Sequence, residues 1–131
     1  MSNRLMDHPW VFGKKLKIVS GYFLPDTAAT PVVVSQGGGV SGVAHTDTGK
    51  FTITLVDPYH KCVGFQAMLA TADDSTDLYA QAGAVANEGT STPITAVVKL
   101  KTGSSNTDVA AAADTKVFFQ LWFEDSSALG V

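Results

Sequence analysis

The sequence predicts an all-β protein, an antiparallel β-sandwich of jelly-roll type, and three observations support this prediction. The 131 residues contain about eight short stretches with strand patterning, most of which alternate apolar and polar side chains. Turns rich in glycine, proline and aspartate separate these stretches. No stretch has the length and period of a long helix. We therefore expect one domain, with an N-terminal arm at residues 1–13 and the sandwich at residues 14–131.

The composition indicates a surface that lies against neighbours. Charged residues make up only 16% of the chain, against about 25% in typical domains. Such a surface suits buried contacts, because each unpaired charge taken out of water costs several kcal/mol. A net charge of −3 offers no basic face for nucleic acid. With one cysteine, Cys62, the chain cannot form an internal disulfide. Residues 1–9 lack the apolar core of a signal peptide, and no run approaches the roughly 20 apolar residues of a membrane span, so we expect assembly in a reducing cytoplasm.

The arm carries three apolar residues, Trp10, Val11 and Phe12, among charged and polar ones. No single period fits residues 1–13, so they predict no regular element. Apolar side chains in a terminal segment are stabilised by docking. Two placements remain open, on the chain's own sheet or on a neighbouring subunit.

Residues 16–23 form the first predicted strand. The basic cluster of Lys14, Lys15 and Lys17 alternates with apolar residues here. We interpret these lysines as the solvent side of the strand; the alternative is an anion contact. The two sides of the strand are Leu16, Ile18, Ser20 and Tyr22 on one, and Lys17, Val19, Gly21 and Phe23 on the other.

Two short strands are expected at residues 31–36 and 40–46, on either side of the triple glycine at 37–39. Glycine-rich turns cradle phosphate when a helix follows them. Here neither a Lys-Ser/Thr pair nor a helical pattern follows, so the glycines predict a flexible corner.

Residues 49–59 contain the clearest strand signal of the chain. Phe51, Ile53 and Leu55 lie on one side of an extended backbone. Proline at position 58 cannot donate to a ladder and therefore ends the strand. The other side carries Thr52, Thr54 and Val56.

The second half of the chain predicts further strands at residues 62–71, 78–85 and 94–101. Between the first two, Asp73, Asp74 and Asp77 bunch carboxylates. A calcium site is the alternative reading, but the loop lacks the glycine and distal glutamate of a calcium-binding hand, so a solvated turn is favoured. Four alanines at 110–113 allow one helical turn at most.

The last predicted strand, residues 117–124, is apolar on both sides. Such a strand is central in its sheet and covered on both faces. One cover is the opposite sheet; the other is the arm or another subunit. The interface candidates are Trp10, Val11, Phe12, Phe118 and Trp122.

The sequence carries no catalytic or metal signature. The histidines at positions 8, 45 and 60 have no ligand spacing among themselves. Cys62 and His60 can share a side of a strand, but a lone buried thiol is the commoner state. We expect no enzyme, no cofactor and no metal. A hydrolase using His45, His60 and Cys62 is the weakest alternative.

Four features follow one another in the chain: Gly21-Tyr22-Phe23 before the turn at Pro25, the glycine-rich corner, the run from Gly49 to Tyr59, and Ala113-Asp114-Thr115 before a strand that leads to Asp125-Ser126-Ser127. In this order, over about residues 16–127, they resemble small virion structural proteins of tailed bacteriophages. The resemblance implies a β-sandwich on the capsid exterior, usually a homotrimer, that cements the lattice of the major capsid protein. It brings no catalytic residues.

We therefore expect a head decoration protein of a virion, assembled in the host cytoplasm. The alternative is a receptor- or glycan-binding module of a tail fibre or baseplate. In that case exposed aromatic residues, Trp10, Tyr59 or Tyr79, would stack on sugar.

Overall fold

The prediction of an antiparallel β-sandwich is confirmed. The computed structural model describes residues 16–26, 30–36, 38–71, 77–109 and 115–124, and none of these is helical. Its strands are β1 (Leu16–Phe23), β2 (Val33–Gln36), β3 (Val40–Asp47), β4 (Lys50–Leu55), β5 (Lys61–Ala70), β6 (Leu78–Ala86), β7 (Thr95–Thr102), β8 (Ser105–Asn106) and β9 (Lys116–Glu124). The arm, the aspartates at 73 and 74 and the alanines at 110–113 lie outside the described residues.

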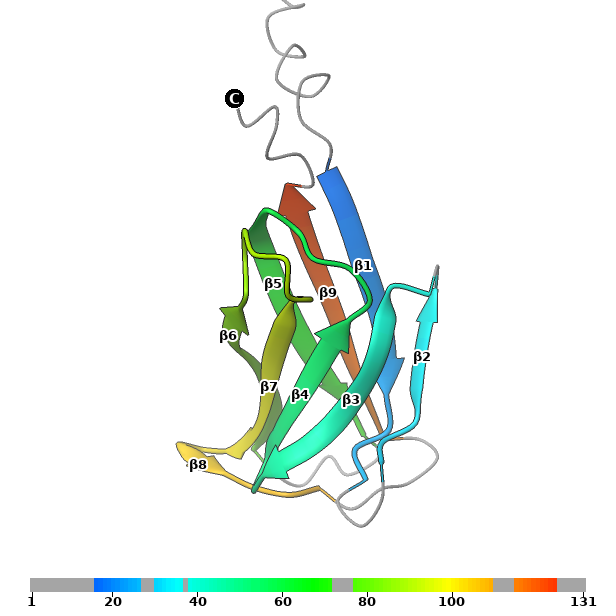
Figure 1. Ribbon diagram of the computed structural model, residues 1–131. Helices are drawn as coiled ribbons and strands as arrows, with labels where there is room; N and C mark the ends of the chain where they lie inside the picture. The colour runs from blue at the N-terminus through cyan, green and yellow to red at the C-terminus, as the bar shows by residue number, and fades with distance from the viewer. Residues whose placement is uncertain (1–15, 27–29, 37, 72–76, 110–114, 125–131) are drawn as a thin grey trace, which may run out of the picture.

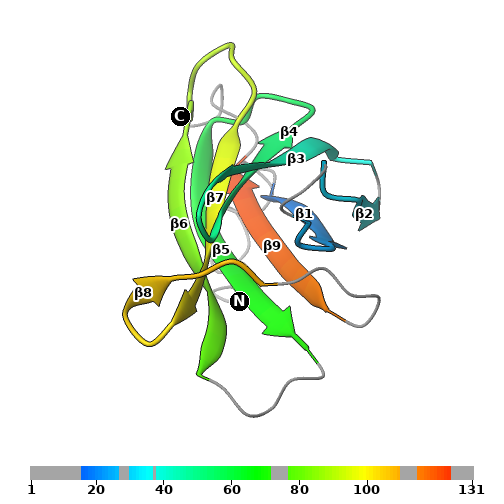
Figure 2. The same cartoon turned by 90° about the horizontal axis from the view of Figure 1, so that it is seen from below.

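The strands form two layers. A four-stranded sheet has the order β2-β1-β9-β5, and a five-stranded sheet has the order β3-β4-β7-β6 with β8 on β7. Every pairing is antiparallel. Figure 1 shows the five-stranded sheet in front, and Figure 2 shows the two layers from below. The chain crosses between the sheets after β2, β4, β5 and β8.

The core lies between the layers. In β9, Val117, Phe119, Leu121 and Phe123 are at most 3% exposed, and they face the buried side of β4, where Phe51, Ile53 and Leu55 alternate with half-buried residues as predicted. Phe23 joins the layers, with its ring centroid 5.2 Å from that of Phe51 and 6.3 Å from that of Phe119. The predicted central position of residues 117–124 is confirmed, since β9 lies between β1 and β5.

A segment after β8 fixes the turn between β3 and β4. Gly49 in this turn has a φ of +67°, which glycine adopts without strain. Its N–H donates to Oδ1 of Asp108 at 2.6 Å, and its carbonyl accepts from the N–H of Leu100 at 2.7 Å. The turn is therefore hydrogen-bonded both to β7 and to the segment after β8.

Two details differ from the predictions for individual segments. Lys17 is exposed, but it lies on the same side of β1 as the buried Val19 and Phe23, so the lysine does not mark the outer side. The outer side is instead apolar. No strand was predicted between residues 102 and 115, a polar and alanine-rich stretch, but this part of the chain contains β8, which pairs with Lys101 and Thr102. Two exposed polar residues carry no hydrophobic pattern, so the sequence did not indicate this strand.

Candidate functional site

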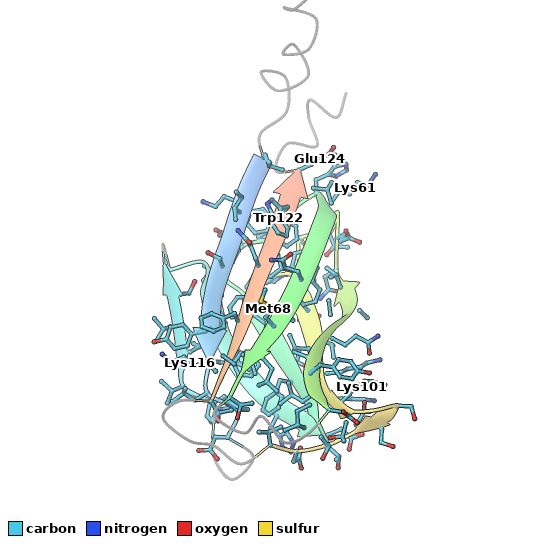
Figure 3. The ribbon with its side chains drawn as sticks, turned by 180° about the vertical axis from the view of Figure 1, so that it is seen from behind. Lys61, Met68, Lys101, Lys116, Trp122 and Glu124 are labelled. Carbon is cyan, nitrogen blue, oxygen red and sulfur yellow. The ribbon has the colours of Figure 1, made fainter. Side chains whose placement is uncertain are left out.

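The outer side of the four-stranded sheet is rich in large apolar residues. Exposed fractions reach 61% at Leu16 and 59% at Met68. Figure 3 views this side and shows Met68 and Trp122 on neighbouring strands. We call the following set the apolar outer face: Leu16, Ile18, Tyr22, Val34, Met68, Phe118 and Trp122.

One row of this face crosses all four strands. Tyr22 is the register partner of Val34 on β2 and of Phe118 on β9, and Phe118 is the partner of Met68 on β5. The rings of Tyr22 and Phe118 lie 5.6 Å apart and tilted by 55°, a favourable aromatic geometry. The Nζ of Lys116 lies 4.9 Å from the centroid of the Tyr22 ring.

A second apolar row lies four residues further along the strands. Here Trp122 is the partner of Ile18 on β1 and of Gly64 on β5. A Cβ at position 64 would stand 2.9 Å from the indole of Trp122, so glycine leaves room for the indole beside β5.

A polar row, Ser20-Gln120-Gln66, separates the two apolar rows. Around it lies an open groove of about 490 Å³. Its floor and walls combine aromatic rings with the amides of Gln66 and Gln120. The lining comprises Ser20, Gly21, Tyr22, Val34, Gln66, Met68, Phe118, Phe119 and Gln120.

The outer side of the five-stranded sheet has a different character. Thr52 and Thr54 of β4 are half-buried there, and Thr46 lies with its Oγ1 3.4 Å from that of Thr52. Lys50 and Lys99 are register partners on the same side. Hydroxyl and charged groups are well hydrated when exposed, so this side of the sheet is stable in contact with water.

The structure places two of the five predicted interface residues on one face. Phe118 and Trp122 both belong to the apolar outer face, whereas Trp10, Val11 and Phe12 lie outside the described residues. Tyr22, Val34 and Met68, which lie in the same row as Phe118, were not among the predicted interface residues. Period two does put Tyr22 with Ile18, but only strand pairing brings Met68 of β5 beside them.

His45 has a structural contact. Its Nε2 lies 3.0 Å from Oδ1 of Asp108, the same oxygen that accepts from Gly49. The imidazole also lies against the Phe51 ring, with the centroids 5.1 Å apart. These contacts connect the end of β3 to the segment after β8.

Cys62 lies at the start of β5, at the opposite end of the sandwich from the turn between β3 and β4 (Figure 1). Its thiol donates to the carbonyl of Gly64 at 3.3 Å, and its N–H donates to Glu88. Burial raises the pKa of the Cys62 thiol, so little nucleophilic thiolate forms at neutral pH. His45 and Cys62 are therefore not brought together.

The aromatic residues suggested for sugar stacking are placed differently. Tyr59 is only 6% exposed and stacks on Phe123, with the ring centroids 4.6 Å apart, so its ring faces are not open to a sugar. Tyr79 is exposed, and its hydroxyl donates to the carbonyl of Gly103.

Neither a metal centre nor a membrane helix is found in the part of the chain that the structure describes. Within these ranges no three His, Cys, Asp or Glu side chains gather as a metal-binding group. The same residues include no helix long and apolar enough to cross a bilayer. Comparisons with protein families, with curated proteins and with solved structures found no match.

Proposed function

We propose that this chain is a non-enzymatic decoration protein of a bacteriophage head, which binds the lattice of the major capsid protein as a homotrimer. The observation that carries the proposal is the apolar outer face. Large apolar patches rimmed by polar groups mark interaction surfaces in soluble proteins. The phage setting comes from the order of motifs in the sequence.

The composition of the face supports a protein interface. Aromatic residues and methionine are enriched at interface cores, and charges are depleted there. Lys61 and Glu124 lie at one end of the four-stranded sheet and Lys116 lies at the other (Figure 3), so charges flank the apolar rows. This arrangement resembles an apolar core with a polar rim.

We assign this face to contacts between copies that are related by cyclic symmetry. A sheet face on one protomer can meet a different surface of the next protomer, and three such contacts close a ring. A trimer then presents three equal binding sites to a symmetric lattice, and multivalent attachment raises the apparent affinity without new contacts.

Met68→Lys is expected to weaken binding to capsids strongly, by preventing the trimer from forming. The substitution places a charge in the centre of the apolar outer face, where burial without a partner is costly. We expect at least about 30-fold weaker binding, because a chain that no longer forms the trimer loses its multivalent attachment to the lattice. Cosedimentation with heads that lack the protein measures this change.

Thr52→Lys is the matched control, since it adds the same charge to the outer side of the other sheet. It should bind as the unchanged protein does. Wild-type binding by Met68→Lys, or equal losses in both variants, would contradict the assignment of the face.

The groove favours a second candidate function, recognition of a glycan by a tail fibre or baseplate. Tyr22 and Phe118 offer aromatic rings, and Gln66 and Gln120 offer amide donors and acceptors beside them. Sugars bind to such combinations of stacking and hydrogen bonding. Imaging of the particle separates the two functions, because copies over the whole shell exclude a fibre tip.

A further inference from the structure

The four-stranded sheet ends in two edge strands, β2 and β5, whose outer edges pair with no strand among the residues that the structure describes. They lie at opposite sides of the sheet (Figure 3). An open edge is a template for a further strand, and proteins usually protect it with charges, proline or a bulge. Residues 62–70 of β5 contain no charged residue and no proline, and neither does β2. These two edges therefore lack that chemical protection.

The edges of the five-stranded sheet are irregular by comparison. The register of β3 shifts at residues 40–42 and 45–47, and that of β6 shifts at residues 82–85. By contrast, β5 pairs regularly from Gly64 to Ala70, and β2 pairs with β1 without a shift. Bulges disrupt further pairing. Among the described sheet edges, β2 and β5 are therefore the ones that offer a regular backbone to another strand.

The hydrogen bonds between β1 and β2 show which backbone groups of β2 are directed outward. The N–H of Leu24 donates to the carbonyl of Val32 at 3.0 Å. Hydrogen-bonded pairs alternate along an antiparallel ladder, so Val34 also bonds to β1. The N–H and C=O groups of Val33 and Ser35 are therefore directed away from β1.

The same alternation, followed across the sheet, gives the outward groups of β5. Tyr22 bonds to β2 in this pattern, so its row partner Phe118 bonds to Met68 and not to Tyr22. The N–H and C=O groups of Ala67 and Leu69 are therefore directed away from β9. Each edge presents two residues with outward backbone groups, at the same spacing.

We propose that β5 of one copy pairs with β2 of a second copy, antiparallel, with Met68 opposite Val34. In this register the outward groups of Ala67 meet those of Ser35, and those of Leu69 meet those of Val33. Within one sheet β2 and β5 run in opposite directions. Rotation about an axis parallel to the strands keeps these directions, so the two edges meet in the antiparallel sense.

This register also continues the rows of the apolar outer face from copy to copy. The apolar row that ends at Met68 meets Val34, where the same row begins. The polar row that ends at Gln66 meets Gln36, the register partner of Ser20. A shift by two residues would set Gln66 opposite Val34, and a shift by one would set opposite sides of the strands against each other.

The contact is heterologous, because different edges of the two copies meet, and its repetition closes a ring when the rotation permits. The number of copies, three, rests on the proposed function. The five-stranded sheets need the wider circumference, so the apolar outer face is directed toward the axis. The ring would thus remove from water the side of the sandwich that is apolar.

A cysteine pair tests the contact. In a Cys62→Ser background, Met68→Cys with Val34→Cys places two Cβ atoms opposite each other between copies, within the range of a disulfide. Within one copy β1 and β9 separate the two positions by roughly 14 Å, at about 4.8 Å per strand, so the disulfide forms only between copies. We expect oxidation to convert most of the chain to a covalent trimer on a non-reducing gel, with the linked peptides identified by mass spectrometry.

Single variants in the same background show which edges meet. Met68→Cys alone and Val34→Cys alone should form no disulfide, whereas the two chains refolded together should give linked dimers. Gln66→Cys with Val34→Cys, two residues out of register, should cross-link at least about tenfold more slowly. Linked dimers from Met68→Cys alone would mean that two β5 edges meet. That result, or equal rates for the two pairs, would overturn the proposal.

Ala70→Cys with Val32→Cys is a second pair in the same register, and it leaves Met68 and Phe118 unchanged. Val32 is 62% exposed and stands opposite Ala70 in the proposed contact, so we expect covalent trimers here too. Light scattering of the reduced variants separates the possible failures. Trimers that form neither disulfide would overturn the edge contact and leave the proposed trimer intact, whereas a monomeric unchanged chain would contradict both.

Discussion

Phe119→Ala is expected to lower the free energy of unfolding by about 3–5 kcal/mol. Phe119 is 3% exposed in the centre of β9 and contacts Phe23, so truncation leaves a cavity between the sheets. The total stability of a domain is about 5–15 kcal/mol, so the variant loses a large fraction of its stability. Urea unfolding followed by circular dichroism measures the difference.

Phe118→Ala is the matched control, one residue earlier on the same strand. Phe118 is 42% exposed, and its main described neighbours are Tyr22 and Met68 on the outer face. We expect a loss of about 1 kcal/mol or less in the isolated protomer. Similar losses in both variants would mean that the two sides of β9 have been assigned wrongly.

Gly49→Ala is expected to cost more than about 2 kcal/mol of stability. Two effects add. The φ of +67° disfavours any side chain, and a Cβ would stand 2.7 Å from the carbonyl oxygen of Leu100 and from the backbone nitrogen of Thr107. These atoms belong to the backbone of a hydrogen-bonded segment, so they cannot easily move away from the added Cβ. Thermal and urea unfolding report the loss.

Gly103→Ala separates the two effects. Gly103 has a similar φ of +60°, but nothing lies within 4 Å of a Cβ placed there. This control should therefore cost only the conformational term, about 1–2 kcal/mol. If Gly49→Ala were no worse than Gly103→Ala, the segment around Thr107 and Asp108 would not hold the turn as described.

Local patterning was sufficient for most strands. Phe51, Ile53 and Leu55 alternate with threonine, so their burial and the position of β4 follow from period two alone. The run at 117–124 is apolar on both sides, which required a central strand. In each case a short stretch of sequence contains the whole physical reason.

Other features depend on contacts between distant segments. His45 and Gly49 meet Asp108 about sixty residues later in the chain, and no local pattern announces such a contact. In β1 both sides carry apolar residues, so Lys17 suggested the wrong outer side. The apolar outer face became visible only when strand pairing placed Met68 of β5 in one row with Phe118 and Tyr22.

The hydrolase alternative illustrates the same limit. Cys62 and His60 are two residues apart, the spacing of side chains on one side of a strand. In the structure the Cys62 thiol donates to the carbonyl of Gly64. This contact spans the register shift between Cys62 and Gly64, an irregularity that no pattern in the sequence indicates.

Light scattering of the purified chain tests the central claim, that the apolar outer face joins copies of this protein. We predict a trimer for the unchanged chain at micromolar concentration. Phe118→Lys should be a folded monomer, because a charge replaces the central ring of the face. Thr54→Lys, on the outer side of the other sheet, should remain a trimer. A monomeric unchanged chain, or a Phe118→Lys variant that still forms trimers, would contradict the account.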